Sequence, residues 1–267
     1  MKLSKKLIPA IGMLMLSAVM LVTSSFAWFS MNTNVAVTGM TVSAKGDQVY
    51  LQIVAGTETT AFSSTEAQVT ANGSTIANLQ PVDVVASYDN DNTPSTVALT
   101  ADIGSNYKWV YNNSSELSSP TATGDYKEAA TTGYYLKQSF MIRLNQTAGK
   151  SVADGALRVS SVAFNNGTTP TDAFGKCVSV FVTCTDGSTT KNMLFKQDDS
   201  YKFTAITGDT FLNANNENKF ANTSGVQVDV YVFFDGSDNN CTIANLEAAK
   251  VSGNYSTYSV DVNFTCA

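Results

Sequence analysis

The chain contains no histidine, and this limits the chemistry that its side chains can perform. Ser-His-Asp and Cys-His nucleophilic systems, His-ligated zinc and the HExxH helix of metalloproteases all require an imidazole. Catalysis by paired carboxylates or by lysine stays open, and a carboxylate-based hydrolase is the enzyme alternative. The sequence favours a protein that is not an enzyme.

Two acidic loops carry oxygen ligands at spacings that suit a cation. Asp89 and Asp91 have the alternate spacing of a calcium loop, but Pro94 stands where an EF-hand requires Gly. Asp235 and Asp238 form a second such loop. Because Asp and Asn also dominate ordinary turns, we expect polar turns and no cofactor, with Ca²⁺ as the alternative.

An aromatic row offers a third kind of chemistry, stacking against sugar rings. Tyr107, Trp109 and Tyr111 alternate along one strand, so they share a face, and Lys108 points the other way. A charged residue on the opposite face indicates that the aromatic face is buried. We expect core packing, with a glycan-binding platform as the alternative.

The elements that position these residues are mostly strands. Apolar residues alternate with polar ones through 49–53, 134–144, 226–234 and 258–264, which is the period of half-buried strands. Helical periodicity is confined to 244–249, with Thr242 as its N-cap. The pattern predicts an all-β, two-sheet β-sandwich of jelly-roll type with long loops, formed as a single domain by residues 39–267.

Composition excludes one class of partner. The chain is 43% hydrophobic but only 14% charged, and its net charge is −6. A nucleic-acid phosphate backbone requires a cationic surface, and no cluster of Lys or Arg lies beyond the N-terminal segment. We therefore expect no nucleic-acid partner.

The first 27 residues have the order of a secretory signal peptide with a signal helix. A lysine-rich start precedes the apolar run 7–22, and Ser25 and Ala27 then form a signal-peptidase site. We expect cleavage and an extracellular or cell-surface location. The alternative is an uncut leader, which would be the only contact with a membrane.

Secretion bears on the four cysteines. Their even number permits two disulfides with three connectivities. Cys177 and Cys184 lie seven residues apart in one apparent strand, which is too far for a bridge. Cys241 and Cys266 are the candidates for a disulfide, and free, buried thiols are the alternative.

The alternation changes phase just after the leader. Val35 and Val37 occupy odd positions, whereas the apolar residues of 40–44 occupy even ones, and Gly39 lies between them. A glycine at such a shift indicates a bulge or pivot between two strands. A bend in one continuous strand is the alternative.

The segment from Ser25 to Ala44 resembles the TasA/camelysin family, Gram-positive secreted proteins processed by a SipW-type signal peptidase. The likeness lies in the aromatic pair Trp28 and Phe29 after the cleavage site, the Thr-Gly break at Gly39, and a strand that ends in Ser-Ala. In addition, 226–234 followed by the loop to Cys241 is similar to a segment of clostridial surface proteins.

The resemblance implies a jelly-roll subunit of extracellular fibres in a biofilm matrix. In such fibres the N-terminal strand, here 28–38, completes the sheet of a neighbouring subunit, so the assembly residues would be Trp28, Phe29, Val35, Val37 and Gly39. The implied partners are copies of the chain, related minor subunits and the SipW-type signal peptidase. The metalloprotease label of camelysin is not carried over, because the chain has no histidine.

The expected function is therefore that of a secreted, self-assembling structural subunit. The alternative is a monomeric cell-surface adhesin or glycan-binding module that uses the aromatic row of Tyr107, Trp109 and Tyr111.

Overall fold

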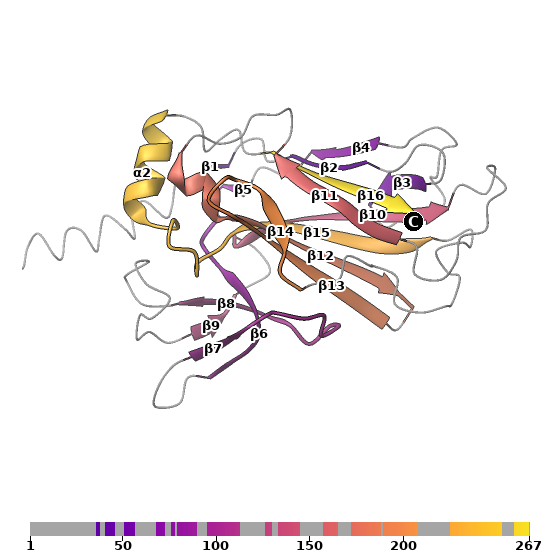
Figure 1. Ribbon diagram of the computed structural model, residues 1–267, viewed down its shortest axis with the longest axis horizontal. Coiled ribbons are helices and arrows are strands. Elements are labelled where there is room, and N and C mark those ends of the chain that lie inside the picture. The colour runs from indigo at the N-terminus through magenta and orange to yellow at the C-terminus, as the bar shows by residue number, and fades with distance from the viewer. Residues whose placement is uncertain are drawn as a thin grey trace, which may run out of the picture.

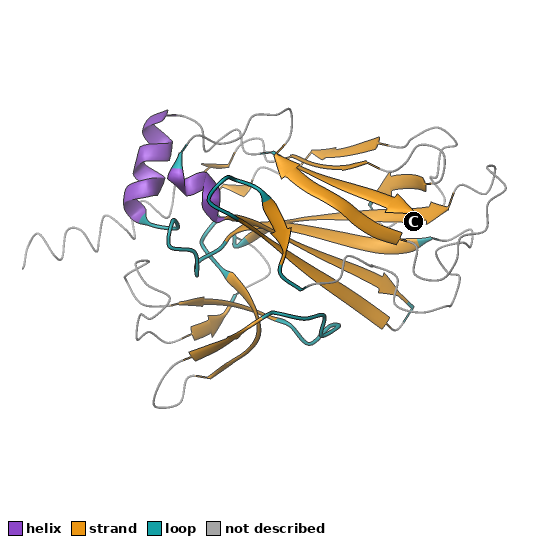
Figure 2. Cartoon of the chain, viewed as in Figure 1, coloured by secondary structure: helices purple, strands orange, loops and turns teal. Residues whose placement is uncertain are grey.

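A computed structural model describes a large part of the chain. The described residues are 36–37, 41–45, 51–56, 68–72, 76–77, 79–89, 95–112, 126–129, 133–144, 157–164, 172–187, 189–207, 225–252 and 259–266. Most of their regular structure is β-strand in antiparallel sheets, so the all-β expectation is confirmed (Figure 2). The expected signal peptide 1–27 lies outside the described residues.

Six antiparallel strands form the largest sheet, which we call the central sheet (Figure 1). From edge to edge they are β14 (Phe203–Ala205), β13 (Thr189–Gln197), β12 (Val178–Asp186), β15 (Val226–Phe234), β10 (Tyr135–Leu144) and β3 (Leu51–Ala55). In the middle of the sheet, Val180 of β12 faces Val232 of β15. Strands β12 and β15 are almost entirely buried, because each has a long neighbour on both sides.

Two four-stranded sheets accompany the central sheet. The first, which we call the covering sheet, contains in order β11 (Leu157–Phe164), β16 (Val260–Cys266), β2 (Thr41–Lys45) and β4 (Gln68–Asn72). The second, which we call the small sheet, contains β7 (Ser95–Ala98), β6 (Asp83–Asp89), β8 (Lys108–Asn112) and β9 (Tyr126–Glu128). The pairing of β16 with β2 is parallel, whereas the other ladders are antiparallel.

The main core lies between the central and covering sheets. On β15 it takes the residues that the alternation predicted to face inward, with Val228, Val230 and Val232 fully buried. From the covering sheet, Val260 and Val262 are equally buried in the same cluster. Each such side chain contributes about 1.5–3 kcal/mol by leaving water, so this core accounts for most of the packing.

A second core lies on the opposite face of the central sheet. Phe181, Tyr231 and Phe233 pack there against Val84 and Leu99, which come from the small sheet and the loop after it. The alternation of the sequence predicted an outward face for Tyr231 and a fold of two sheets. The small sheet forms a third layer because that face of the central sheet is aromatic rather than polar.

The only described α-helix, α2 (Ile243–Ser252), begins where the sequence predicted it. The backbone N–H of Asn245 donates to Thr242 Oγ1 at 3.2 Å, so Thr242 is the N-cap. Leu246 and Ala249 are buried in the main core. The helix lies beside the 3-10 helix η3 (Ala173–Cys177), as Figure 1 shows. No described helix has the length and apolar character to span a bilayer.

Candidate functional site

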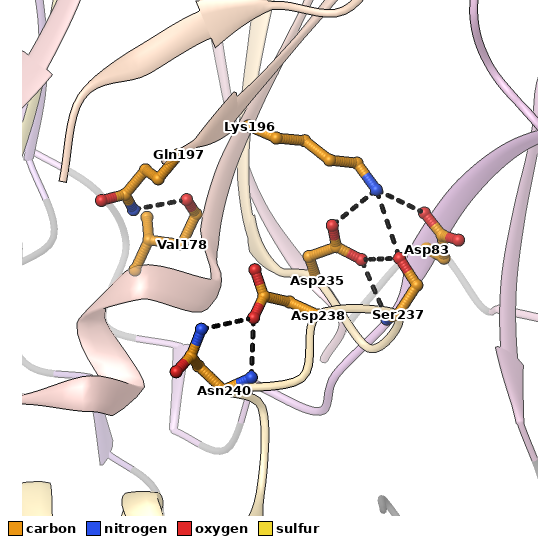
Figure 3. A network of polar contacts seen from close by, with 8 residues as sticks. All are labelled: Asp83, Val178, Lys196, Gln197, Asp235, Ser237, Asp238 and Asn240. Atoms are coloured by element: carbon orange, nitrogen blue, oxygen red, sulfur yellow. Dashed lines mark hydrogen bonds and ion pairs between the residues drawn. The ribbon is translucent and has the colours of Figure 1, made fainter. Parts of the chain in front are cut away.

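A lysine and two aspartates from three separate elements meet at one end of the second core (Figure 3). Lys196 lies near the end of β13, two residues after the buried Leu194, so it points toward the small sheet. Asp235 follows β15, two residues after Phe233, and points the same way. Asp83 is the first residue of β6. Together with Ser237, these residues form what we call the lysine cluster.

The amine of Lys196 is the centre of the lysine cluster. Its Nζ lies 2.6 Å from Asp235 Oδ2 and 3.8 Å from Asp83 Oδ1. It also lies 3.2 Å from Ser237 Oγ. The Asp235 side chain is only 2% exposed, against 28% for Lys196 and 18% for Asp83. The closest ion pair of the cluster is therefore the most protected from water.

Both oxygens of the Asp235 carboxylate have assigned partners. Oδ2 faces Lys196, whereas Oδ1 accepts hydrogen bonds from the Ser237 hydroxyl at 2.6 Å and the Ser237 backbone N–H at 2.9 Å. Hydrogen bonds also hold the backbone around Asp235. The N–H of Asp235 donates to Cys177 O at 2.8 Å, and that of Gly236 donates to Val82 O at 3.1 Å. The Asp235 carboxylate is consequently held in one orientation.

The electrostatics of the cluster favour one proton on Asp83. Burial, followed by repulsion from Asp235, raises the pKa of Asp83 to about 7, although Lys196 acts in the opposite direction. Asp83 Oδ1 is shielded from solvent and has no hydrogen-bond partner among the described residues. For Lys196, burial lowers the pKa, but Asp235 and Asp83 more than offset it and the pKa is raised. With Asp83 protonated, the cluster is an amine cation, one carboxylate and one carboxylic acid, and it is neutral overall.

An open pocket of about 440 Å³ adjoins the lysine cluster and is lined by Lys196, Asp235 and Asp238 among others. Asp238, which the sequence proposed as a calcium ligand with Asp235, accepts hydrogen bonds from the backbone and side chain of Asn240 at 2.7 and 2.9 Å. It therefore forms the polar turn that the sequence predicted.

The described residues around Asp235 and Asp238 do not form a cluster of ligands for calcium. In the part of the chain that the structure describes, no three His, Cys, Asp or Glu residues are placed to hold a metal ion. Asp235 is paired with Lys196, and Asp89 is exposed at the end of β6. Asp91 lies outside the described residues, so a calcium site that includes it stays a prediction.

The expected Cys241–Cys266 disulfide is not formed, because the thiol of Cys241 is free and buried. Cys241 precedes α2, and its thiol neighbours that of Cys177 at the end of η3, which donates to Phe174 O at 2.9 Å. Burial and this neighbour raise the pKa of the Cys177 thiol. Cys184 is also buried and forms no disulfide. The alternative of buried thiols without a disulfide describes these three residues, while the side chain of Cys266, at the end of β16, lies outside the described residues.

The aromatic row on and beside β8 packs against the central sheet. The Trp109 ring lies 4.6 Å from that of Tyr135 and 5.1 Å from that of Phe233, and the Tyr107 ring lies 4.7 Å from that of Phe181. These contacts agree with core packing, the interpretation that the sequence favoured. They occupy the ring surfaces of Tyr107 and Trp109 that a glycan platform would need.

The third member of the row also has a ring partner. Tyr111 stacks on Tyr134, with ring centroids 5.1 Å apart and an interplanar angle of 27°. All three aromatic residues of the proposed platform thus contact other rings.

The N-terminal assembly segment is described only in part. β1 (Ala36–Val37) pairs with β5 (Ile76–Ala77) of the same chain, with Val37 opposite Ile76. The proposed assembly residues Trp28, Phe29, Val35 and Gly39 lie outside the described residues, and so do Ser25 and Ala27 of the cleavage signal.

The sequence pattern indicated Asp235 as a loop residue but did not single out Lys196 or Asp83. The available signal was the period of two, because Lys196 lies two residues after the apolar Leu194 and so shares its face of the strand. Asp83 carries no comparable signal, since its neighbours in the cluster are more than a hundred residues away in the chain.

Comparison with protein-family models, with curated proteins and with solved structures gave no significant match.

Proposed function

We propose that the chain is a secreted structural subunit that self-assembles into extracellular fibres. In this proposal the central and covering sheets form a β-sandwich of jelly-roll type, and the N-terminal strand 28–38 pairs with a neighbouring copy. The leader-like start, the low charge and the likeness of 25–44 to the TasA/camelysin family support it. The lysine cluster has a structural rather than an enzymatic role, and related minor subunits are further candidate partners.

The observation that carries the proposal is that β1 pairs outside the three larger sheets. Among the described residues, β1 and β5 form a separate two-stranded sheet in which Ala36 pairs with Ala77 and Val37 with Ile76. Because these described pairs belong to none of the larger sheets, β1 can make the same ladder with β5 of another copy without opening those sheets. An exchange of identical elements between copies is a low-cost route to assembly.

The exchange can be tested with two single-cysteine variants, Ala36→Cys and Ala77→Cys, which carry partner positions of this ladder. The two purified variants are mixed, allowed to assemble and oxidised. We expect a disulfide-linked dimer on non-reducing gels, because each bridge must then join two chains. Each variant alone is the control for the native cysteines.

The double variant distinguishes the two arrangements. If it gives only an internally bridged monomer, and the mixture gives no linked dimer under assembly conditions, strand donation through this ladder is wrong.

A further inference from the structure

The lysine cluster holds an amine against a carboxylate that is only 2% exposed, beside a second carboxyl group. We propose that Lys196 Nζ and the Asp235 side-chain carbon become joined by an amide bond, with Asp83 transferring the protons. The inference goes beyond the proposed function and does not depend on it. It rests on the distances of 2.6 Å and 3.8 Å from Lys196 Nζ to Asp235 and Asp83.

The reaction balances without an oxidant or any other reagent. A proton first passes from Lys196 Nζ to Asp235 Oδ2, which it faces at 2.6 Å, and the Nζ lone pair then attacks the Asp235 side-chain carbon. The new N–C bond gives a tetrahedral intermediate. Asp83 donates a proton to Oδ2, the C–O bond breaks and water leaves, while the second proton of the nitrogen passes to the Asp83 carboxylate. The ammonium and the carboxylate thus become one amide and one water molecule.

Ser237 supplies the stabilisation that the intermediate requires. Its hydroxyl and its backbone N–H both donate to Asp235 Oδ1, at 2.6 and 2.9 Å. When Nζ attacks, negative charge develops on this oxygen. Two donors that already point at such an oxygen act as an oxyanion hole. The other oxygen, Oδ2, faces Lys196 and is the one that departs.

Proximity and burial favour the reaction. A well-oriented reacting group within the same molecule has an effective concentration of about 10⁵–10⁸ M. Keeping an ion pair out of water is costly, and amide formation removes both charges. The pKa of about 7 for Asp83 suits a group that must both give and take a proton near neutral pH.

The bond would join strands that are not neighbours. Lys196 belongs to β13 and Asp235 follows β15, and β12 lies between these strands in the central sheet. Closing residues 196–235 into a covalent loop restricts the unfolded chain in the way that a disulfide does. Unlike a disulfide, this cross-link cannot be opened by reducing agents.

Peptide mapping of the full, purified chain tests the proposal. The protein is reduced, alkylated and digested with trypsin, which cannot cleave after a lysine whose amine is acylated. We expect a branched product that joins peptides 192–202 and 220–250 and is lighter than their sum by one water. If the digest contains only the linear peptides, including cleavage after Lys196, the proposal is overturned.

Two variants separate the amide from another loss of water. Asp235 precedes Gly236, and such a pair can cyclise by itself with the same change in mass. Lys196→Arg should abolish the branched product and the missing water together. If peptide 220–250 still lacks one water in Lys196→Arg, cyclisation explains the mass and the cross-link is wrong. Asp83→Asn should leave the peptides unlinked, and an undiminished branched product would exclude proton transfer by Asp83.

An exposed ion pair serves as the internal control. Lys108 and Glu128 approach to 3.0 Å, but their side chains are 51% and 55% exposed. They have the proximity of the lysine cluster without its burial or its second carboxyl group. We expect no branched product from this pair in the same digest. A link there would mean that proximity alone suffices and that the lysine cluster is not a special site.

Discussion

Asp83 carries most of the electrostatic cost in the lysine cluster. A buried carboxyl group can avoid that cost by keeping its proton, whereas Asp235 is stabilised as an anion by Lys196 at 2.6 Å and by the two donors of Ser237. Asp83 therefore keeps its proton at pH values below its raised pKa of about 7. The raised pKa of this single residue makes the stability of the folded protein depend on pH.

The stability contributed by Asp83 should decrease as the pH rises from about 4 to about 7. Burial raises the pKa of Asp83 to about 7, so across this range the folded state keeps a proton that the unfolded state has released. The contribution is complete below the unfolded pKa and is lost at about 1.4 kcal/mol per pH unit until the folded pKa is passed. Because burial is the largest cause, the sign is the same with or without the amide bond.

Denaturant unfolding of Asp83→Asn and of the unaltered protein checks this pH dependence. At a pH of about 8 the variant should gain stability relative to the unaltered protein, compared with their difference at a pH of about 5. Asp89→Asn, at the exposed other end of β6, is the matched control and should leave the pH dependence unchanged. An Asp83→Asn variant that follows the same pH curve as the unaltered protein would contradict the assignment.

At the scale of elements, the small sheet is attached to the central sheet by aromatic packing. Trp109 of β8 contacts rings from three strands of the central sheet, those of Tyr135, Phe181 and Phe233. The Phe181 and Phe233 contacts are edge-to-face, with interplanar angles of 88°, an arrangement that aromatic pairs prefer. The small sheet is therefore part of the folded body through this face.

Trp109→Ala should lower the free energy of unfolding by about 3 kcal/mol, because it removes a large ring from a packed cluster. Val97→Ala is the matched control in the same sheet, since Val97 is 57% exposed and its truncation should change stability by no more than about 0.5 kcal/mol. Chemical denaturation measures both. Loss of glycan binding with unchanged stability would instead support the adhesin alternative.

At the scale of the whole molecule, assembly and folding should be separable. Among the residues whose burial the structure describes, the main core is formed by positions between 51 and 264. Deleting 28–38 should therefore leave a folded monomer with an almost unchanged melting temperature that forms no filaments. Electron microscopy and calorimetry measure the two properties. Normal filaments from the shortened chain would falsify strand donation.

Much of the fold could be predicted because alternation and capping are local properties. The inward face of β15, from Val226 to Phe234, was evident from a period of two, and Thr242 signalled the start of α2. The absence of histidine excludes imidazole chemistry on composition alone. These conclusions need only the residue and its near neighbours.

Tertiary structure decided the features that depend on distant partners. The alternation predicted an outward face for Tyr231, but the small sheet covers it together with Phe233. Cys241 neighbours Cys177, because the loop before α2 is hydrogen-bonded to the end of η3. Lys196 and Asp235 become a reactive pair only because β13 and β15 end at the same side of the central sheet, where β6 begins. The spacing of these residues in the sequence does not predict their contact, because packing between the sheets creates it.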